Sequence, residues 1–518
     1  MAPVLLLAGC MMVGPDFTRP HAPLAAKWRE SGLPEVATTP QEDAHWWTVF
    51  NDPVLTRLIQ SAYAQNLPLR QAGVRVLQAR AQLGVALGEF YPQQQVLTSN
   101  VSYNRLPVSI PYLPFTNNYW QASFGAAAGW EIDIWGKLRR AIQSADDSYL
   151  ASIADYDNVL VSLTADVAAN YVQLRTLQKQ IVIARANVER EREAVAIARA
   201  RFEGGVVSER DVDQALNVLT ATEATVPQLT IQIAQAKNEI TLLLGLPPGQ
   251  LDGMLAGPAD IPIAPARVAV GIPADLLRRR PDIRAAELQA AAQCAQIGFA
   301  KADLYPTFTL TGNVGTISTN VAEANLGDLF NAGTLAYNVG PALQWNILNY
   351  GQITNNVRVQ DAAFQGLLIN YQNTVLKAQA EVENALALFI QSRKQADDLS
   401  RSVQAATGAL NVAMIQYTQG IADFTTVLTA EQNLFQAQNN LAVAMGNIPQ
   451  GLIAAYRAMG GGWQIRQGHD LVPAQTREEM ARRTNWSSLL TPVDLLQPRT
   501  PGLPSPKDEG PLVRPPQW

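Results

Sequence analysis

The residue with the most distinctive chemistry in the sequence is Cys10, which ends the apolar segment VLLLAGC. A short apolar run followed by two small residues and a cysteine is typical of a bacterial lipoprotein processing site. We therefore expect a lipid on Cys10 and a signal segment in residues 1–9. This segment holds no Lys or Arg, so it lacks the usual basic start of a signal peptide, and we expect it to be truncated. An apolar start that arose by chance is the alternative. Cys294 would have no disulfide partner, and we expect it to be a small packing residue.

The other residues that could do chemistry are scattered. His21, His45 and His469 lack the spacing of metal ligands, and the eight methionines form no cluster for a soft metal. We find no nucleophile, acid–base pair or ligand set of an enzyme. We therefore expect no enzymatic activity, no metal and no cofactor besides the lipid on Cys10.

The composition narrows the class of protein further. Only 16% of the residues are charged, against about 25% in an ordinary soluble domain, so something other than solvent covers part of the surface. No run of about 18 apolar residues follows the N-terminus, which excludes a bundle of transmembrane helices. If the chain spans a membrane, it must do so as a closed β-barrel. The net charge of −5 without a basic block argues against a nucleic-acid partner.

The chain contains a tandem repeat. WEIDIWG at 130–136 aligns with WNILNYG at 345–351, and Gly205 aligns with Gly420, both at an offset of 215 residues. This spacing predicts a duplicated unit. The predicted parts are a lipidated arm at 10–51, a first repeat at 52–249, a linker at 250–273, a second repeat at 274–463 and a Pro-rich, mostly disordered tail at 464–518.

Each repeat contains a long heptad pattern. Apolar residues recur every seven positions from Leu160 to Phe202, and again from Val375 to Tyr417. This period predicts long helices in a left-handed supercoil. Nothing breaks the first helix over about 66 residues, which corresponds to a rod of roughly 100 Å.

A glycine turn and a returning helix follow each long helix. Gly205 and Gly420 stand where the heptads stop, and the apolar period resumes after them. Each repeat is therefore predicted to form a helical hairpin with a glycine at its tip. Pro227 and Pro449 interrupt the returning helices, where we expect kinks or ends.

Four stretches alternate apolar and polar residues with period two, namely 97–103, 121–131, 307–314 and 337–346. Each has about the length of a tilted membrane strand. They predict two strand hairpins, hence four strands per chain. Because the smallest bacterial barrels need about eight strands, the chain must oligomerise. A dimer would give eight strands and a trimer twelve, and only the larger barrel would leave an aqueous lumen.

Six segments resemble, in order, the outer-membrane efflux factors of the TolC/OprM type, in particular the NodT-like lipoproteins. They are VGPDFTRP at 13–20, WWTVFNDPVL at 46–55, WEIDIWGKLR at 130–139, LGLPPG at 244–249, RRRPDIRAAE at 278–287 and AMGGGW at 458–463. The resemblance covers about nine tenths of the chain. It implies a mixed α and β, TolC-like fold, in which a trimer joins a long α-helical barrel to a 12-stranded transmembrane β-barrel.

The resemblance also implies a function and partners. The chain would be the outer-membrane exit duct of a tripartite efflux pump, lipid-anchored, extending into the periplasm and contributing to multidrug resistance. Its partners would be two further copies, outer-membrane lipid, a periplasmic adaptor (membrane fusion) protein and an inner-membrane pump of the RND type. The adaptor is expected to engage the helical tips at Gly205, Val206, Gly420 and Ile421.

Gate residues follow from the resemblance where the sequence matches. In that family an aspartate, a tyrosine and an arginine hold the periplasmic mouth closed, and Asp211 and Tyr417 match the first two. Ala422 stands at the arginine position, so Arg210 and Asp423 are the candidate substitutes. The alternatives are that Asp211 only stabilises a helix start and that Tyr417 only fills a heptad position.

Two points remain open at the level of sequence. Thr426 and Thr429 stand where the family carries acidic rings that select for cations. The main competing interpretation is a lipid-anchored coiled-coil structural spacer of the cell envelope, which explains the heptads and Cys10. That interpretation leaves the four alternating stretches without a role.

Overall fold

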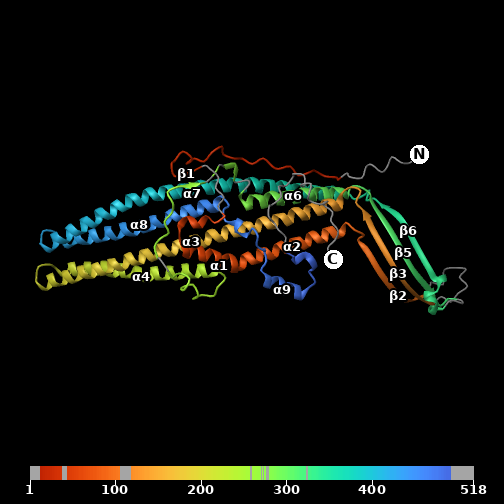
Figure 1. Cartoon of the computed structure of the whole chain (residues 1–518), viewed down its shortest axis with the longest axis horizontal. Helices are drawn as coiled ribbons and strands as arrows, with labels where there is room; N and C mark the ends of the chain where they lie inside the picture. The colour runs from red at the N-terminus through yellow and green to blue at the C-terminus, as the bar shows by residue number, and fades with distance from the viewer. Residues whose placement is uncertain are drawn as a thin grey trace.

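The computed structural model forms a long rod with helices along most of its length and a sheet at one end (Figure 1). It describes residues 12–37, 44–105, 118–256, 259–269, 271, 273–275, 279–321 and 325–491. Cys10, the predicted lipidation site, lies outside these residues, as does the end of the tail at 492–518. Among the helices that the structure describes, none is both long enough and apolar enough to cross a membrane.

Two helical hairpins make up most of the rod. The long helices α3 (Lys137–Glu203) and α7 (Gln352–Thr418) have 67 residues each, and the returning helices α4 (Glu209–Leu243) and α8 (Phe424–Ala458) have 35 each. Both hairpins turn at the end of the rod that is opposite the sheet (Figure 1). The predicted pair of long helices with short returns is therefore confirmed.

The returning helices continue through their prolines. Of the predicted kinks or ends at the prolines, the ends are excluded, because Pro227 lies inside α4 and Pro449 inside α8. A proline inside a helix removes one hydrogen bond and crowds the preceding turn. Packing of the apolar face along the neighbouring long helix outweighs that local cost, since Pro449 itself is buried against the rest of the chain.

Shorter helices lead into and out of the hairpins. They are α1 (Pro53–Gln65), α2 (Leu67–Glu89), α6 (Pro281–Ala302) and α9 (Ala474–Arg483). Short 3-10 helices lie at Trp46–Phe50, Pro273–Asp275, Leu326–Phe330, Ala332–Thr334, Trp463–Arg466 and Ser487–Leu490. Asp52 begins α1 by accepting hydrogen bonds from the backbone nitrogens of Val54 (2.8 Å) and Leu55 (3.0 Å).

The four predicted strands form one antiparallel sheet in the order β2-β3-β5-β6. These are β2 (Gln94–Arg105), β3 (Asn118–Ile132), β5 (Thr307–Thr319) and β6 (Leu335–Gln344). The two repeats meet where β3 pairs with β5, with Phe124 opposite Thr316. A separate parallel pair joins β1 (Val36–Ala37) to β4 (Val268–Ala269), which ties the N-terminal arm to the segment between the repeats.

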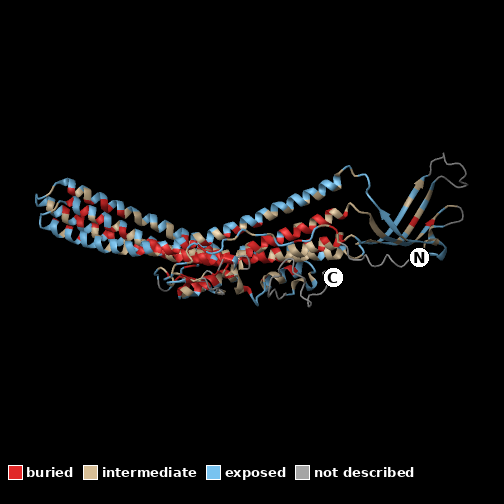
Figure 2. Cartoon of the chain, turned by 90° about the horizontal axis from the view of Figure 1, so that it is seen from above, coloured by how far each residue is buried: buried red, intermediate tan, exposed pale blue. Residues whose placement is uncertain are grey.

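The core lies in the middle of the rod, with a second apolar cluster near the hairpin tips (Figure 2). In the middle, Trp46, Trp47 and Phe389 are buried where both repeats meet. Near the tips the buried residues come from all four hairpin helices, including Val195, Ala215 and Val427. The two hairpins therefore pack against each other inside one chain over their outer turns.

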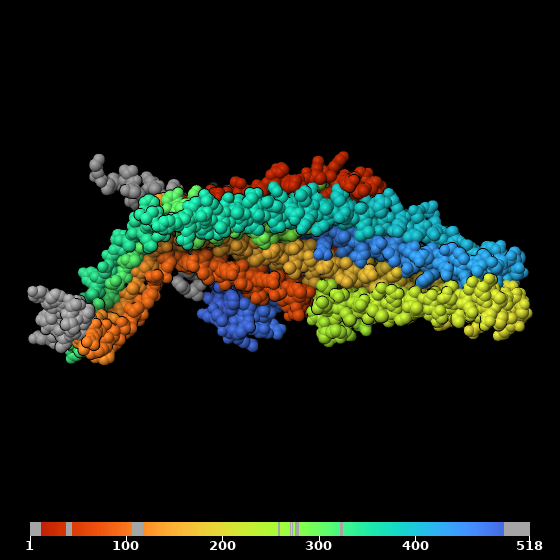
Figure 3. Space-filling view, turned by 180° about the vertical axis from the view of Figure 1, so that it is seen from behind, coloured from red at the N-terminus to blue at the C-terminus, as the bar shows by residue number. Residues whose placement is uncertain are grey.

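The N-terminal arm and the tail lie on the surface of the rod (Figure 3). The arm follows α7, where the side chain of Gln379 accepts a hydrogen bond from the backbone of Ala25 at 2.8 Å. The prediction of a mostly disordered tail from residue 464 is wrong for 464–491, which contains α9. Arg466 forms a buried ion pair with Asp157 of α3, and Met480 is buried. These contacts anchor a polar segment in which the sequence shows no apolar period.

Candidate functional site

The hairpin tips are the most exposed ends of the helical rod, and each turns through a glycine. Gly205 has φ +69° and Gly420 has φ +74°, a left-handed conformation that glycine adopts without a steric penalty. The next residues, Val206 and Ile421, close each helix by donating to the carbonyls of Arg201 (2.9 Å) and Gln416 (2.8 Å). Their side chains are 64% and 72% exposed. The four residues predicted to dock a partner thus share one exposed end of the rod.

The two tip aspartates each begin a returning helix. Asp423 is the N-cap of α8, where its Oδ1 accepts from the Thr426 nitrogen (3.2 Å) and hydroxyl (2.8 Å). Hydrogen bonds from Thr425 and Thr426 hold the pKa of Asp423 below its usual range. Asp211 lies in the first turn of α4 and is buried, with the Arg210 guanidinium 3.5 Å from its Oδ1. Both carboxylates are favoured there by the positive end of a helix dipole.

Tyr417 lies buried between the two hairpins. Its ring centre is 5.0 Å from that of Phe424 at the start of α8. Its hydroxyl has no hydrogen-bond partner among the residues that the structure describes. Burial raises the pKa of Tyr417, the Arg201 guanidinium opposes that change, and the Asp211 carboxylate adds to it. Tyr417 therefore fills its heptad position and also lies within electrostatic range of Asp211.

Arg201 is the tip residue that the sequence analysis missed. Its guanidinium lies 4.3 Å from the centre of the Tyr417 ring and donates a hydrogen bond to the Tyr417 carbonyl. Arg201 belongs to the first hairpin and Tyr417 to the second, so this contact links the tips. An arginine before the aromatic residue of the tip motif, where the second repeat has Gln416, was the available signal. Arg210, the predicted substitute, is instead largely exposed.

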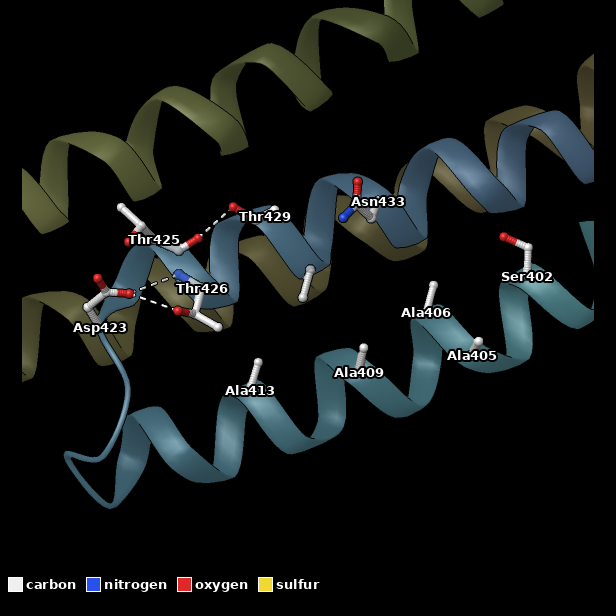
Figure 4. Close-up of a pocket in the computed structure, with 11 residues that line it drawn as sticks. Ser402, Ala405, Ala406, Ala409, Ala413, Asp423, Thr425, Thr426, Thr429 and Asn433 are labelled. Carbon is white, nitrogen blue, oxygen red and sulfur yellow. Dashed lines mark hydrogen bonds between the residues drawn. The ribbon is translucent and has the colours of Figure 1, made fainter.

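A groove of about 710 Å³ runs between α7 and α8 beside the second tip (Figure 4). Small side chains of α7 face hydroxyl and amide side chains of α8 across it. The lining residues are Ser402, Ala405, Ala406, Ala409 and Ala413 on α7, and Asp423, Thr425, Thr426, Thr429, Ala430 and Asn433 on α8. Thr426 and Thr429, which stand where the family carries acidic rings, are thus uncharged polar groups of this wall, to which Asp423 adds a carboxylate.

Comparison with known proteins identifies the family. The family model described as "Outer membrane efflux protein" matches residues 58–246 and 272–461, which fall on the two repeats. The chain belongs to this family. The predicted role as an outer-membrane efflux channel is thereby confirmed, and the same membership means that the chain is not an enzyme. The spacer interpretation, which had no role for the strands, is not supported.

Individual relatives agree with this assignment. Nodulation protein T of Rhizobium leguminosarum bv. trifolii is 30% identical over 441 residues, covering 85% of this chain and 92% of the relative. The solvent efflux pump outer membrane protein SrpC of Pseudomonas putida is 30% identical over 480 residues, covering 90% of this chain and 98% of the relative.

Solved structures confirm the predicted TolC-like fold. The outer-membrane channel OprN matches with a TM-score of 0.81 and 31% identity, covering 87% of this chain and 99% of that chain. CusC matches with a TM-score of 0.73 and 27% identity, covering 87% and 100%. Long helices joined to four antiparallel strands per chain are thus the shared architecture.

Proposed function

We propose that three copies of this chain form the exit duct of a tripartite efflux pump, which passively conducts substrates expelled by an inner-membrane transporter. The observation that carries the proposal is the open four-stranded sheet. Within the described residues β2 and β6 each pair on one side only, so both edges are free. Free edges must be covered or closed. Three such sheets joined edge to edge would make the predicted barrel of about twelve strands, which is large enough for an aqueous lumen.

Apolar exposure supports both the membrane position and the trimer. On the strands, Leu97, Tyr337 and Val339 are 69%, 77% and 74% exposed. Side chains of this kind are stable against lipid. On α7, Val359 and Ile369 are also more than half exposed, in the segment 352–370, which has no buried residue. A neighbouring copy would cover that face.

Lipidation of Cys10 would anchor the trimer at the membrane. Met12, two residues later, lies against Gly136 at the base of the sheet, and the Val13 nitrogen donates to the Trp135 carbonyl at 3.0 Å. The start of the described arm therefore lies beside the strands that would enter the membrane. Incorporation of labelled fatty acid into the natural protein, and none into Cys10→Ala, is the expected result.

The tips would serve as gate and docking surface. Tyr417 and Asp211 would hold the closed mouth, with Arg201 supplying from the first hairpin the positive charge that Ala422 lacks. Arg210 would add to the field at Asp211, and Asp423 would fix the start of α8.

Docking of a periplasmic adaptor is proposed at the exposed Gly205, Val206, Gly420 and Ile421. The small-residue groove beside the second tip supports this site, because it leaves room for a helix to pack closely. An inner-membrane pump of the RND type would complete the assembly. The names of relatives as efflux-pump components support such a pump.

Single-channel current through the purified full-length trimer in a planar bilayer tests the proposal. Discrete conductance steps are expected, with longer open times for Asp211→Ala than for Asp213→Ala, an exposed acid of the same helix. Absence of steps in every variant after confirmed insertion would contradict a duct. Equal open times for the two aspartate variants would contradict the gate assignment alone.

A further inference from the structure

Two buried carboxyl groups face the seam between the hairpins below the tips. Glu191 of α3 is 3% exposed and Glu431 of α8 is 5% exposed. They belong to different hairpins, on helices that pack against each other, and the second apolar cluster surrounds this region. Carboxylates are almost never buried in this way without a partner, because removing a charge from water is costly.

The surroundings leave one oxygen of each group unsatisfied. The Thr222 hydroxyl of α4 donates to Glu191 Oε1 at 2.9 Å. Glu191 Oε2 and Glu431 Oε2 have no hydrogen-bond partner in the described part of the chain. Arg190 of α3, the cation that acts on both carboxyls, donates instead to the amide oxygens of Asn187 and Gln438. No ion pair with either carboxylate is found among the described residues.

Charges on the packed helices favour protonation on balance. Burial is the largest cause, and with the neighbouring groups it gives both carboxyls a raised pKa of about 7. The Thr222 hydrogen bond and Arg190 lower the pKa of Glu191, and Glu223 of α4 raises it. Glu191 raises the pKa of Glu431, and Arg190 lowers it. Within the described chain, no charged residue of α7 is among the groups that act on these two carboxyls.

We propose that Glu191 and Glu431 form a proton-binding pair that couples the packing of the two hairpins to pH. When protonated, the pair carries no charge, and the hairpins pack tightly around it. When ionised, two like charges face each other in an apolar seam, and water must enter to solvate them. The consequence for a channel rests on the proposed gate, because separating the hairpins below the tips would favour an open mouth.

The direction of the effect follows from linkage. A carboxyl whose pKa is about 7 in the packed seam and 4.5 in water binds its proton more tightly when the hairpins are packed. Packing is therefore strongest below about pH 4.5, weakens as the pH rises, and reaches its weakest value above about pH 7. Each proton released on separation changes the equilibrium up to about tenfold per pH unit within that window.

Hydrogen–deuterium exchange of the full-length trimer tests the pair without requiring conduction. The double variant Glu191→Gln, Glu431→Gln keeps the shape of the protonated groups and cannot ionise. At pH 4, below the pKa that both groups have in water, the natural protein and the variant should exchange nearly alike in the segments 186–214 and 411–436. At pH 8 the natural protein should exchange at least about tenfold faster there. Comparing proteins at the same pH removes the intrinsic pH dependence of exchange.

Three results would overturn the proposal. The first is equal exchange of the natural protein and the double variant at pH 8. The second is an exchange rate that depends on pH in the control Glu189→Gln, at an exposed site, in the same way as it does in the double variant. Infrared difference spectra provide the third: a protonated-carboxyl band that titrates near pH 7 must weaken in Glu431→Gln alone, and an unchanged band refutes the proton site. If exchange and band behave as expected but no protein conducts, the pair stands and the proposed duct fails.

Discussion

Replacing Arg201 with alanine should loosen the contact between the two hairpin tips. The guanidinium covers the Tyr417 ring at 4.3 Å and donates to the Tyr417 carbonyl, where the α7 helix ends. The contact thus combines a cation–π interaction, a charged hydrogen bond and a favourable charge at a helix C-terminus. It joins the two hairpins, so its loss acts on their separation more than on the stability of either helix.

The magnitude follows from these contacts. A cation–π pair contributes about 0.5–2 kcal/mol, and a hydrogen bond to a charged group about 1.5–3 kcal/mol. Arg201 is only half-buried, and solvent weakens its electrostatic interactions, so we take about 1–2 kcal/mol per chain as the combined contribution of the two contacts. Since about 1.4 kcal/mol is a tenfold change, one tip would open about 5- to 30-fold more often. If the three tips of a trimer open together, the loss of stabilisation of the closed mouth would add to about 3–6 kcal/mol.

Open probability in planar bilayers measures this effect. Arg199→Ala is the matched control, because Arg199 lies two residues earlier on the same helix and is exposed. Arg201→Lys should give an intermediate open probability, since an ammonium keeps the charge but loses planar stacking on the ring. If Arg201→Ala opens no more often than Arg199→Ala, the contact is a packing feature and the gate lies elsewhere.

Three further changes test the packing of the rod, each by thermal unfolding of the trimer in detergent. Gly451→Ala should lower the free energy of unfolding by about 1–3 kcal/mol, because the added Cβ would lie 2.6 Å from a backbone nitrogen of α7. Gly408→Ala is the control and should have no such effect, since no atom lies within 4 Å of its Cβ position. Equal effects of the two variants would contradict the close approach at Gly451. Arg466→Met should lower the free energy of unfolding by about 3–5 kcal/mol, because it removes the ion-pair partner of the buried Asp157 carboxylate. An unchanged melting temperature would show that this ion pair does not hold the tail segment on the rod. Burial and the neighbouring Asp146 carboxylate raise the pKa of Asp147 from 3.8 to about 7, so this group should lower the stability of the natural protein as the pH rises from about 3.8 to about 7. Asp147→Asn should remove this share of the loss and leave the share of Glu191 and Glu431, and an identical pH profile would refute the assignment.

The long elements could be predicted because their apolar periods repeat over many residues. Heptads predict α3 and α7, alternation of apolar and polar residues predicts the four strands, and a glycine indicates each tip. The strands β2, β3 and β5 are longer than predicted, because ladder hydrogen bonds continue past the alternating stretches, whereas β6 has the predicted length of ten residues and begins and ends two residues earlier. By contrast, α9 has a polar sequence, and its fold depends on the buried Met480 and on the tail contacts of Arg466. A one-dimensional pattern carries no information on such contacts.

The tip site could be predicted only in part for the same reason. Asp211 and Tyr417 were identified through family resemblance, and both lie at the seam. Arg201 meets Tyr417 across 216 residues of sequence, which requires the relative register of two hairpins. Glu191 did leave a signal, because it falls between Ala184 and Ala198 at the same heptad spacing, where an apolar residue is expected. A charged residue inside a heptad seam was therefore the readable sign of the buried pair.

The duplication makes the two sides of the seam between the hairpins unequal, which supports the proposed gate. The repeats share the residues that build the hairpins, but they differ at several equivalent positions along the seam. Arg201 corresponds to Gln416, Asp211 to Thr426 and Glu191 to Ala406, each at the offset of 215 residues. The first hairpin thus supplies most of the charged groups, and the second supplies the aromatic ring and small or hydroxyl side chains. Such an unequal contact favours one register between the hairpins. Separating the hairpins would then break the contacts across the seam all at once, so the packed and the separated arrangements would be two distinct states.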